Sequence, residues 1–174
     1  VVCTDFSITE DEAEAACDDL AERLKQQILS KMWDEETGFF YDLHHETEEK
    51  AMVRNVVGIY PLWAQITEDK HLELLKRFFS EDDFAAGSGF ASVSRDCPVF
   101  APQGGWKGNF FKGRNGCMWD GPSWPYTTGI ALDAIALQSK NNAHRFDKEF
   151  GKYLREYSLE HYKEKNLDIP YLVE

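Results

Sequence analysis

The sequence predicts a mainly α fold that consists of antiparallel helix pairs, one long aromatic loop and a small β-hairpin. Three observations predict it. Apolar residues recur at helical spacing in several segments, a short aromatic run is bounded by turn residues, and a stretch of about 40 residues lacks regular spacing. The chain has 174 residues, which suits one domain and is long enough to bury a sizeable core.

The first predicted helix covers residues 9–32. Thr9 and Glu12 have the spacing of a capping box, and acidic residues fill the first turn. Its apolar stripe comprises Ala13, Cys17, Leu20, Leu24, Ile28 and Met32. Residues 38–43 then predict an extended segment or a small hairpin, and the acidic turn 46–49 would connect it to the returning chain.

Four more helices are predicted from the apolar spacing. They cover residues 55–66, 67–80, 122–139 and 144–165. The first of them is apolar nearly all round, so we expect it to be buried, with Pro61 in its first turn or at a kink. Pro122 and Pro125 fit a first helical turn. His71 and His144 stand near helix starts and are expected to be exposed.

The charge balance excludes several classes of partner. The 31 acidic and 19 basic residues give a formal charge of −12, whereas a surface for nucleic acid or anionic lipid needs the opposite sign. No apolar run of about 18 residues occurs, so no membrane span is predicted. Phosphate-binding glycine loops are missing from the sequence, and no cofactor is expected. The four cysteines form no Cys-x-x-Cys pair, and they leave redox state and localisation open.

Residues 100–126 combine aromatic side chains with six of the twelve glycines. The aromatic residues are Phe100, Trp106, Phe110, Phe111, Trp119, Trp124 and Tyr126. An exposed indole offers a flat apolar face that the C–H face of a pyranose ring fits, and glycine lets the backbone approach a ligand. Two interpretations stay open at this point: a sugar subsite, or large aromatics that fill the core between helices.

Several motifs along nearly the whole chain stand in a fixed order. They are Trp33-Asp34 with Gly38-Phe39-Phe40-Tyr41-Asp42, Gly58-Ile59-Tyr60-Pro61-Leu62-Trp63-Ala64, Gly89-Phe90-Ala91-Ser92-Val93-Ser94, Trp119-Asp120-Gly121-Pro122-Ser123-Trp124 and Ile169-Pro170-Tyr171-Leu172-Val173-Glu174. This ordered set resembles the glycoside hydrolase clan with an (α/α)6 toroid, which contains processing α-glucosidases and mannosylglycerate hydrolases. The resemblance implies that residues 1–174 form a single domain, the C-terminal part of a larger toroid. A complete toroid has twelve helices, so the edge of this part should be apolar and uncovered.

The same resemblance implies an inverting hydrolysis of O-glycosidic bonds. One carboxylic acid protonates the leaving oxygen, and a second carboxylate activates water on the opposite face. Glu174 is the implied general base. Trp106, Trp119, Asp120 and Trp124 are the implied binding residues for an oligosaccharide or glycoside, although many clan members carry Arg or Asn at the position of Asp120.

The general acid has no counterpart in the chain. In the clan it is an aspartate upstream of the Gly-Phe-Phe-Tyr-Asp segment, and residues 1–32 hold no matching Trp- and Gly-rich loop around an aspartate. Asp42 and Asp120 are the only internal substitutes; Asp42 is expected to be structural and Asp120 to accept a sugar hydroxyl. We therefore expect it before Val1, in a missing N-terminal half of the toroid, and we expect the isolated chain to show little or no turnover.

Two other classes of function stay open. A non-catalytic carbohydrate-binding or helical interaction module would expose the aromatic loop without needing Glu174. An isomerase or epimerase on the same toroid would use histidines as acid and base, and therefore needs His144 and His161 to face that loop.

One further group of residues has the chemistry of metal ligands. His44 and His45 lie in an acidic turn with Asp42 and Glu46, which could attract a metal ion. No further ligand stands at a fixed spacing, so the sequence favours a solvated turn and no metal.

Overall fold

The computed structural model describes residues 9–87, 89–101 and 119–162. The fold is mainly α, as predicted. Its helical elements are α1 (Glu10–Gln27), the π-helical η1 (Ile28–Met32), the 3₁₀ turns η2 (Val56–Ile59) and η3 (Asp69–Glu73), α2 (Tyr60–Trp63), α3 (Leu74–Phe78), α4 (Pro125–Asn141) and α5 (Asp147–Glu160). Within the described ranges, none of the helices combines the length and the apolar character needed to cross a membrane.

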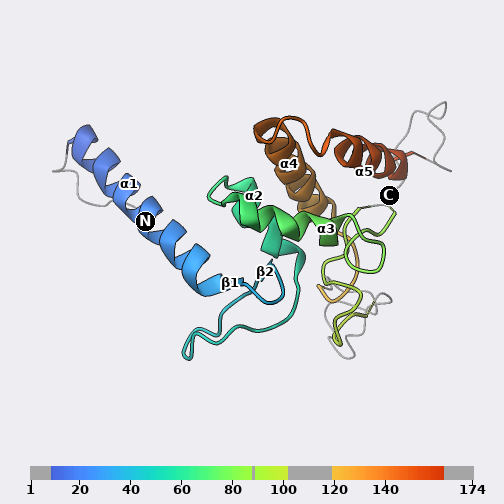
Figure 1. The fold of residues 1–174 in the computed structure, drawn as a ribbon, viewed down its shortest axis with the longest axis horizontal. Helices are drawn as coiled ribbons and strands as arrows, with labels where there is room; N and C mark the ends of the chain where they lie inside the picture. Colours follow the sequence, from blue (N-terminus) through green and yellow to red (C-terminus); the bar gives the residue numbers. More distant parts are fainter. Residues whose placement is uncertain (1–8, 88, 102–118, 163–174) are drawn as a thin grey trace, which may run out of the picture.

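Helix α1 begins where the sequence predicts it. The side chain of Thr9 accepts a hydrogen bond from the Glu12 N–H, and the Glu12 carboxylate accepts one from the Thr9 N–H at 2.8 Å. These bonds to Thr9 hold the pKa of Glu12 below its usual value. The helix extends away from the rest of the chain (Figure 1), and none of its residues is buried. Its apolar stripe is therefore largely uncovered, and Leu24 is 48% exposed.

A two-stranded antiparallel sheet follows, formed by β1 (Trp33–Asp34) and β2 (Phe39–Phe40). Trp33 pairs with Phe40 and Asp34 with Phe39. The predicted hairpin is thus present, but only its second strand, β2, lies within residues 38–43. Its first strand, β1, precedes them. The acidic turn also returns the chain as expected, because Leu43 and Lys50 form an antiparallel bridge.

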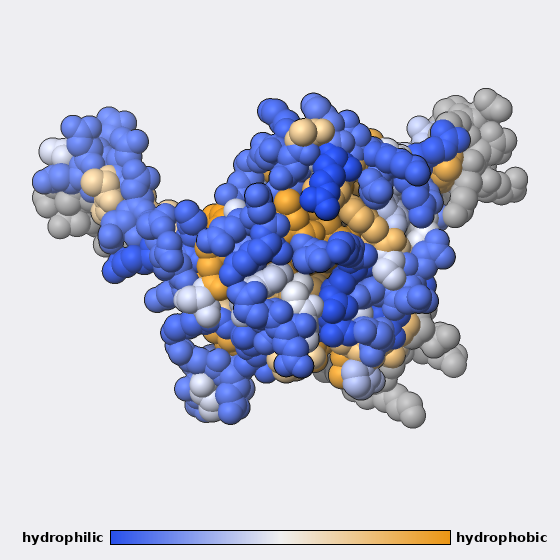
Figure 2. Space-filling model, viewed as in Figure 1, coloured by the Kyte–Doolittle hydropathy of each residue, from blue (hydrophilic) through white to orange (hydrophobic). Residues whose placement is uncertain are grey.

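The core is aromatic and lies where α2, α3 and α4 meet the hairpin (Figure 1). The fully buried rings include Phe39, Phe78, Phe84 and Phe90. Phe84 stacks between Phe39 and Phe78, at ring-centroid distances of 5.7 and 4.5 Å. On the surface, apolar atoms show between hydrophilic side chains of the helical body (Figure 2).

The predicted helix over residues 55–66 is a 3₁₀ turn followed by the single turn α2. Pro61 stands in the first turn of α2, which was one of the two expected positions, the other being a kink. A Cβ atom on Gly58 would lie 2.5 Å from the Phe39 ring, so close packing requires glycine there. Val56, Ile59 and Leu62 are fully buried, as expected for this segment, whereas Trp63 is 43% exposed.

The last two helices pack against each other. Pro125 occupies the first turn of α4 as predicted, while Pro122 lies before the helix. Helix α5 is shorter than residues 144–165. Its inner side rests on Tyr153, whose hydroxyl donates to the Phe79 carbonyl oxygen at 3.0 Å. The neighbouring Leu154 is 42% exposed.

The expected exposure of His71 is wrong. Its side chain is buried, with 1% exposed, and its ring meets the Trp33 ring edge-on at 4.6 Å. Nδ1 of His71 accepts the Glu68 N–H at 2.9 Å, which caps η3. Burial lowers the pKa of His71, and the neighbouring Lys70 charge acts in the same direction.

Candidate functional site

Two indole rings lie together at the N-terminal end of α4. Trp119 and Trp124 are stacked, with ring centroids 5.8 Å apart and an interplanar angle of 20°. Trp119 is 42% exposed, and Trp124 is half-buried at the N-cap of the helix. A pair of nearly parallel indoles with one accessible member is an apolar surface of the shape that a pyranose ring fits.

Asp120 lies between these two indoles in the sequence and is half-buried. Its Oδ1 atom is enclosed and has no hydrogen-bond partner among the residues that the structure describes. An enclosed carboxylate oxygen without a partner is costly, so such groups are found where a ligand or another group supplies a donor. Asp120 follows Trp119 directly in the chain, and its part in a sugar subsite stays a prediction.

Ser92 holds the segment that carries the indoles. Its side chain is fully buried, and Oγ accepts the Gly121 N–H at 3.0 Å. The Ser92 N–H donates to the Pro122 carbonyl oxygen at 3.2 Å, and the Ser92 carbonyl oxygen accepts from Val56 at 2.9 Å. One serine thus connects the indole segment to η2, across long sequence separations.

A second set of contacts fixes the residues just before α4. Thr128 Oγ1 lies 3.2 Å from Ser123 Oγ and accepts the Phe90 N–H at 3.3 Å. Gly89 has φ +152°, and a Cβ atom there would come within 2.6 Å of both hydroxyl oxygens. This close approach explains why glycine precedes Phe90.

Tyr126 is a candidate that sequence reasoning did not select. It is 68% exposed, stands two residues after Trp124 and lies near the hydroxyl of Tyr60 on α2. Burial raises the pKa of Tyr60, and Tyr126 adds to the rise. Its place in the aromatic run was visible in the sequence, but its contact with α2 required the packing of α2 on α4. Ser92 and Thr128 had no signal in the sequence that set them apart from other hydroxyl residues.

Of the two histidines that an isomerase would need, His144 lies away from the indoles. His144 is exposed near the far end of α4, where its Nδ1 lies 3.1 Å from Asp147 Oδ2. His161 caps the C-terminus of α5, with Nδ1 2.9 Å from the Tyr157 carbonyl oxygen and its ring edge-on to the Tyr157 ring. The isomerase alternative therefore loses one of its two histidines, His144.

The remaining predicted site residues are Trp106 and Glu174. Both lie outside the described residues. The structure therefore brings together three of the five predicted residues, Trp119, Asp120 and Trp124, and leaves the other two as sequence-based predictions. The described cysteines, Cys17 and Cys97, are free thiols.

Two solved structures share this fold. A sialidase superposes with a TM-score of 0.72 and 23% identity, over 90% of this chain and 14% of that chain. The GH63 mannosylglycerate hydrolase of Thermus thermophilus, solved in complex with Tris, gives a TM-score of 0.52 and 19% identity, over 74% of this chain and 27% of that one. At these identities the likeness concerns the fold.

Sequence comparison defines the class of the protein: residues 7–169 match a glycoside hydrolase domain. The matching model is the mannosylglycerate hydrolase MGH1-like glycoside hydrolase domain, and the chain belongs to that family. The resemblance inferred from the ordered motifs is thereby confirmed.

Curated relatives match shorter stretches. The cytosolic neutral trehalase of Kluyveromyces lactis is 37% identical over 54 residues, which is 31% of this chain and 7% of the trehalase. An uncharacterized protein of Borreliella burgdorferi is 30% identical over 82 residues, which is 47% of this chain and 17% of that protein. The matches therefore span less than a fifth of either relative.

Proposed function

We propose that this chain is the sugar-binding part of an inverting O-glycoside hydrolase. The observation that carries the proposal is the stacked indole pair of Trp119 and Trp124, of which Trp119 is 42% exposed. Membership of a glycoside hydrolase family supports it, because the same segment carries the family resemblance.

The chemistry of the three residues is complementary to a sugar. The indole faces stack against the C–H face of a pyranose, and burial of that face gives affinity without directional bonds. The Asp120 carboxylate supplies an acceptor for a hydroxyl hydrogen, and this bond fixes the orientation of the ring. A charge-assisted hydrogen bond of this kind stabilises by about 1.5–3 kcal/mol.

In the proposed reaction Glu174 is the general base. Its carboxylate removes a proton from water as the water attacks the anomeric carbon, and the general acid gives a proton to the leaving oxygen. We place that acid outside residues 1–174. The two carboxyl groups would stand roughly 6.5–9.5 Å apart, to leave room for the water. Loss of proton donation alone lowers turnover by about 10²–10⁴-fold, so the isolated chain should bind sugar and hydrolyse it poorly.

The names of the relatives suggest the first ligands to test. Trehalose and mannosylglycerate follow from the trehalase and the mannosylglycerate hydrolase. Both would be titrated into the full chain by calorimetry, together with a panel of glucosides and mannosides. We expect saturable binding of at least one of them.

Trp119→Ala tests the indole platform, and Trp63→Ala is its matched control. The two indoles are equally exposed, at 42% and 43%, but Trp63 lies on α2 outside the pair. We expect Trp119→Ala to weaken sugar binding about 2- to 13-fold and Trp63→Ala to leave it unchanged, because one stacking contact contributes about 0.5–1.5 kcal/mol. Equal losses in both variants would refute the platform.

A non-catalytic carbohydrate-binding module remains the second candidate. The indole pair with its exposed Trp119 supports this module as well as it supports the hydrolase, because sugar binding does not need the general base Glu174. Glu174→Gln in a longer protein that contains this chain separates the two functions. Loss of hydrolysis with sugar affinity kept supports the hydrolase, and unchanged hydrolysis supports the binding module.

A further inference from the structure

The acidic turn after the hairpin has a defined backbone. The His44 N–H donates to the Glu49 carbonyl oxygen at 2.9 Å, and the Ala51 N–H donates to the Asp42 carbonyl oxygen at the same distance. The Glu48 carboxylate also pairs with Lys31 of η1, at 2.7 Å. The two backbone hydrogen bonds therefore close the turn, and the ion pair with Lys31 connects it to η1. Residues 44–46 lie at the tip of this closed turn.

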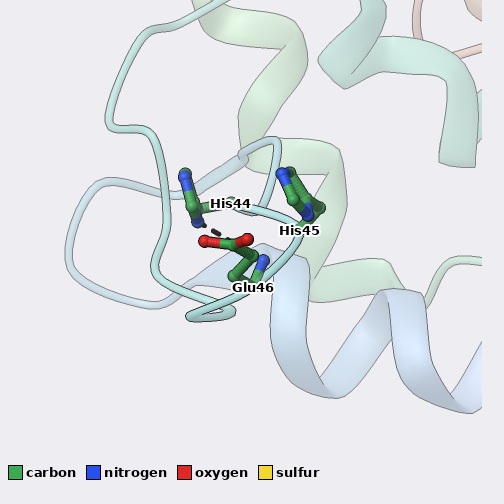
Figure 3. Close-up of side chains that lie close together, drawn as sticks. All are labelled: His44, His45 and Glu46. Carbon is green, nitrogen blue, oxygen red and sulfur yellow. Dashed lines mark hydrogen bonds between the residues drawn. The ribbon is translucent and has the colours of Figure 1, made fainter.

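Three side chains with metal-ligating atoms gather at this tip. His44, His45 and Glu46 are all exposed, and one ligand atom from each lies within 4.8 Å of the other two. In Figure 3 the Glu46 carboxylate lies beside the His44 ring, and the His45 ring stands on the same turn. The rings are stacked, with centroids 5.1 Å apart and an interplanar angle of 17°. Among the residues that the structure describes, this is the one such group of histidine, cysteine and acidic side chains.

The present contacts of these ligands are weak enough to be replaced. Nδ1 of His44 accepts the N–H groups of Glu46 and Thr47, each at 3.4 Å, which is long for a hydrogen bond. His45 and Glu46 are exposed and can rotate toward it. Ligand atoms around a tetrahedral zinc ion stand about 3.3 Å apart, given metal–ligand bonds of about 2.0–2.1 Å. Side-chain rotation alone closes that gap.

The charge around the tip also favours a cation. Asp42 and Glu49 are exposed on the same turn, in addition to Glu46 and Glu48. The nearby lysines are already paired: Lys31 with Glu48, and Lys50 with Asp34 at 3.2 Å. The turn thus keeps a net negative charge next to two imidazole ligands.

From this geometry we infer that His44, His45 and Glu46 form a surface site for a divalent transition metal of the zinc type. Two imidazoles favour zinc, copper or nickel over calcium and magnesium, which prefer all-oxygen ligands. Three protein ligands leave one coordination position for water or for a group of a partner. The site lies on the turn after the hairpin and does not depend on the proposed glycosidase function.

The test is a zinc titration of the full chain at pH 7.5, read by competition with a colorimetric chelator. We expect a zinc ion whose binding is weakened at least tenfold by His44→Ala and by His45→Ala, and less strongly by Glu46→Gln. The matched control is His144→Ala, because His144 is also exposed and has a carboxylate 3.1 Å away. Zinc affinity should be unchanged in that variant.

A second readout locates the bound metal. In ¹⁵N-correlated spectra, substoichiometric zinc should shift the amide signals of residues 43–49 and leave those of α4 and α5 in place. Affinity should fall at least tenfold between pH 7.5 and pH 5.5, since metal ligands must be deprotonated. Far-UV circular dichroism of the variants should match the parent, because all three side chains are exposed.

Three results would overturn the proposal. The first is zinc binding that survives His44→Ala, as binding by cysteine thiols would. The second is an equal loss in His144→Ala, which marks unspecific histidine binding. The third is the absence of any zinc-dependent shift at residues 43–49 at millimolar zinc.

Discussion

Replacing Ser92 by alanine should separate the indole segment from its support. The Ser92 side chain is fully buried and its Oγ accepts the Gly121 N–H at 3.0 Å. Alanine fits the space but removes the acceptor, so the buried Gly121 N–H loses its partner. The two backbone hydrogen bonds of Ser92, to Pro122 and from Val56, remain in place. The damage is therefore limited to one unpaired donor.

The expected cost follows from that single donor. An unpaired buried N–H destabilises by about 1–3 kcal/mol. For a domain of this size the melting temperature falls by roughly 2–4 °C per kcal/mol, so we expect a fall of about 2–12 °C. Differential scanning calorimetry measures it. Hydrogen exchange of the Gly121 amide gives a local readout, and it should become about 5- to 150-fold faster.

Ser158→Ala is the matched control for Ser92→Ala. Ser158 lies on α5, is exposed, and its Oγ donates to the Leu154 carbonyl oxygen at 2.7 Å. That carbonyl keeps access to water, and alanine favours the helix, so the melting temperature should not fall. If Ser92→Ala melts within 1 °C of the parent and the Gly121 amide exchanges at the parental rate, the supporting role of Ser92 is wrong.

Three further predictions concern packing and protonation. Gly89→Ala should destabilise the chain by about 1–3 kcal/mol in urea titrations, because a Cβ there meets two hydroxyl oxygens at 2.6 Å and the backbone has φ +152°. The pKa of His71 is lowered by burial, so its contribution to stability is complete above about pH 6.5, the pKa of an unfolded histidine, and is lost as the pH falls below that value; the urea midpoint should fall as the pH is lowered from there, and His71→Gln should remove part of the fall. Leu62→Ala should cost about 2–5 kcal/mol, whereas Leu24→Ala should stay within about 0.5 kcal/mol, since Leu62 is fully buried and Leu24 is 48% exposed on α1.

Controls exist for the first two of these. Gly151 lies on α5, and a Cβ atom added there would meet no other group within 4 Å, so Gly151→Ala should stabilise rather than destabilise. For His71 the control is the urea midpoint of the parent above about pH 6.5, where the contribution of the imidazole is complete. A pH profile that is the same in the parent and in His71→Gln would contradict the assignment to His71.

The prediction succeeded where local chemistry decides the structure. The capping box of Thr9 and Glu12 sets the start of α1, and Pro125 sets the first turn of α4. Both signals act within one helical turn and need no tertiary partner. The structure adds that Trp119 and Trp124, five positions apart, stack on each other, while their role in sugar binding stays a prediction.

The prediction failed where distant residues compete. Residues 55–66 have the composition of one buried helix, yet Gly58 packs on the Phe39 ring and the segment splits into a 3₁₀ turn and α2. His71 was expected at the surface because polar residues near helix starts usually are, and the aromatic core instead encloses its ring beside Trp33. Neither neighbour is visible from local spacing.

The sequence by itself determined the helical class, the family resemblance and the aromatic identity of the candidate site. These depend on residue type and on spacing within one segment. The tertiary structure decided which distant groups support the site: Ser92 reaches Gly121 across 29 positions, and Thr128 reaches Phe90 across 38. It also decided that the stripe of α1 stays largely uncovered within the described residues. Hydrogen bonds and burial between remote segments exist only once the chain has folded, and so no local pattern can encode their partners.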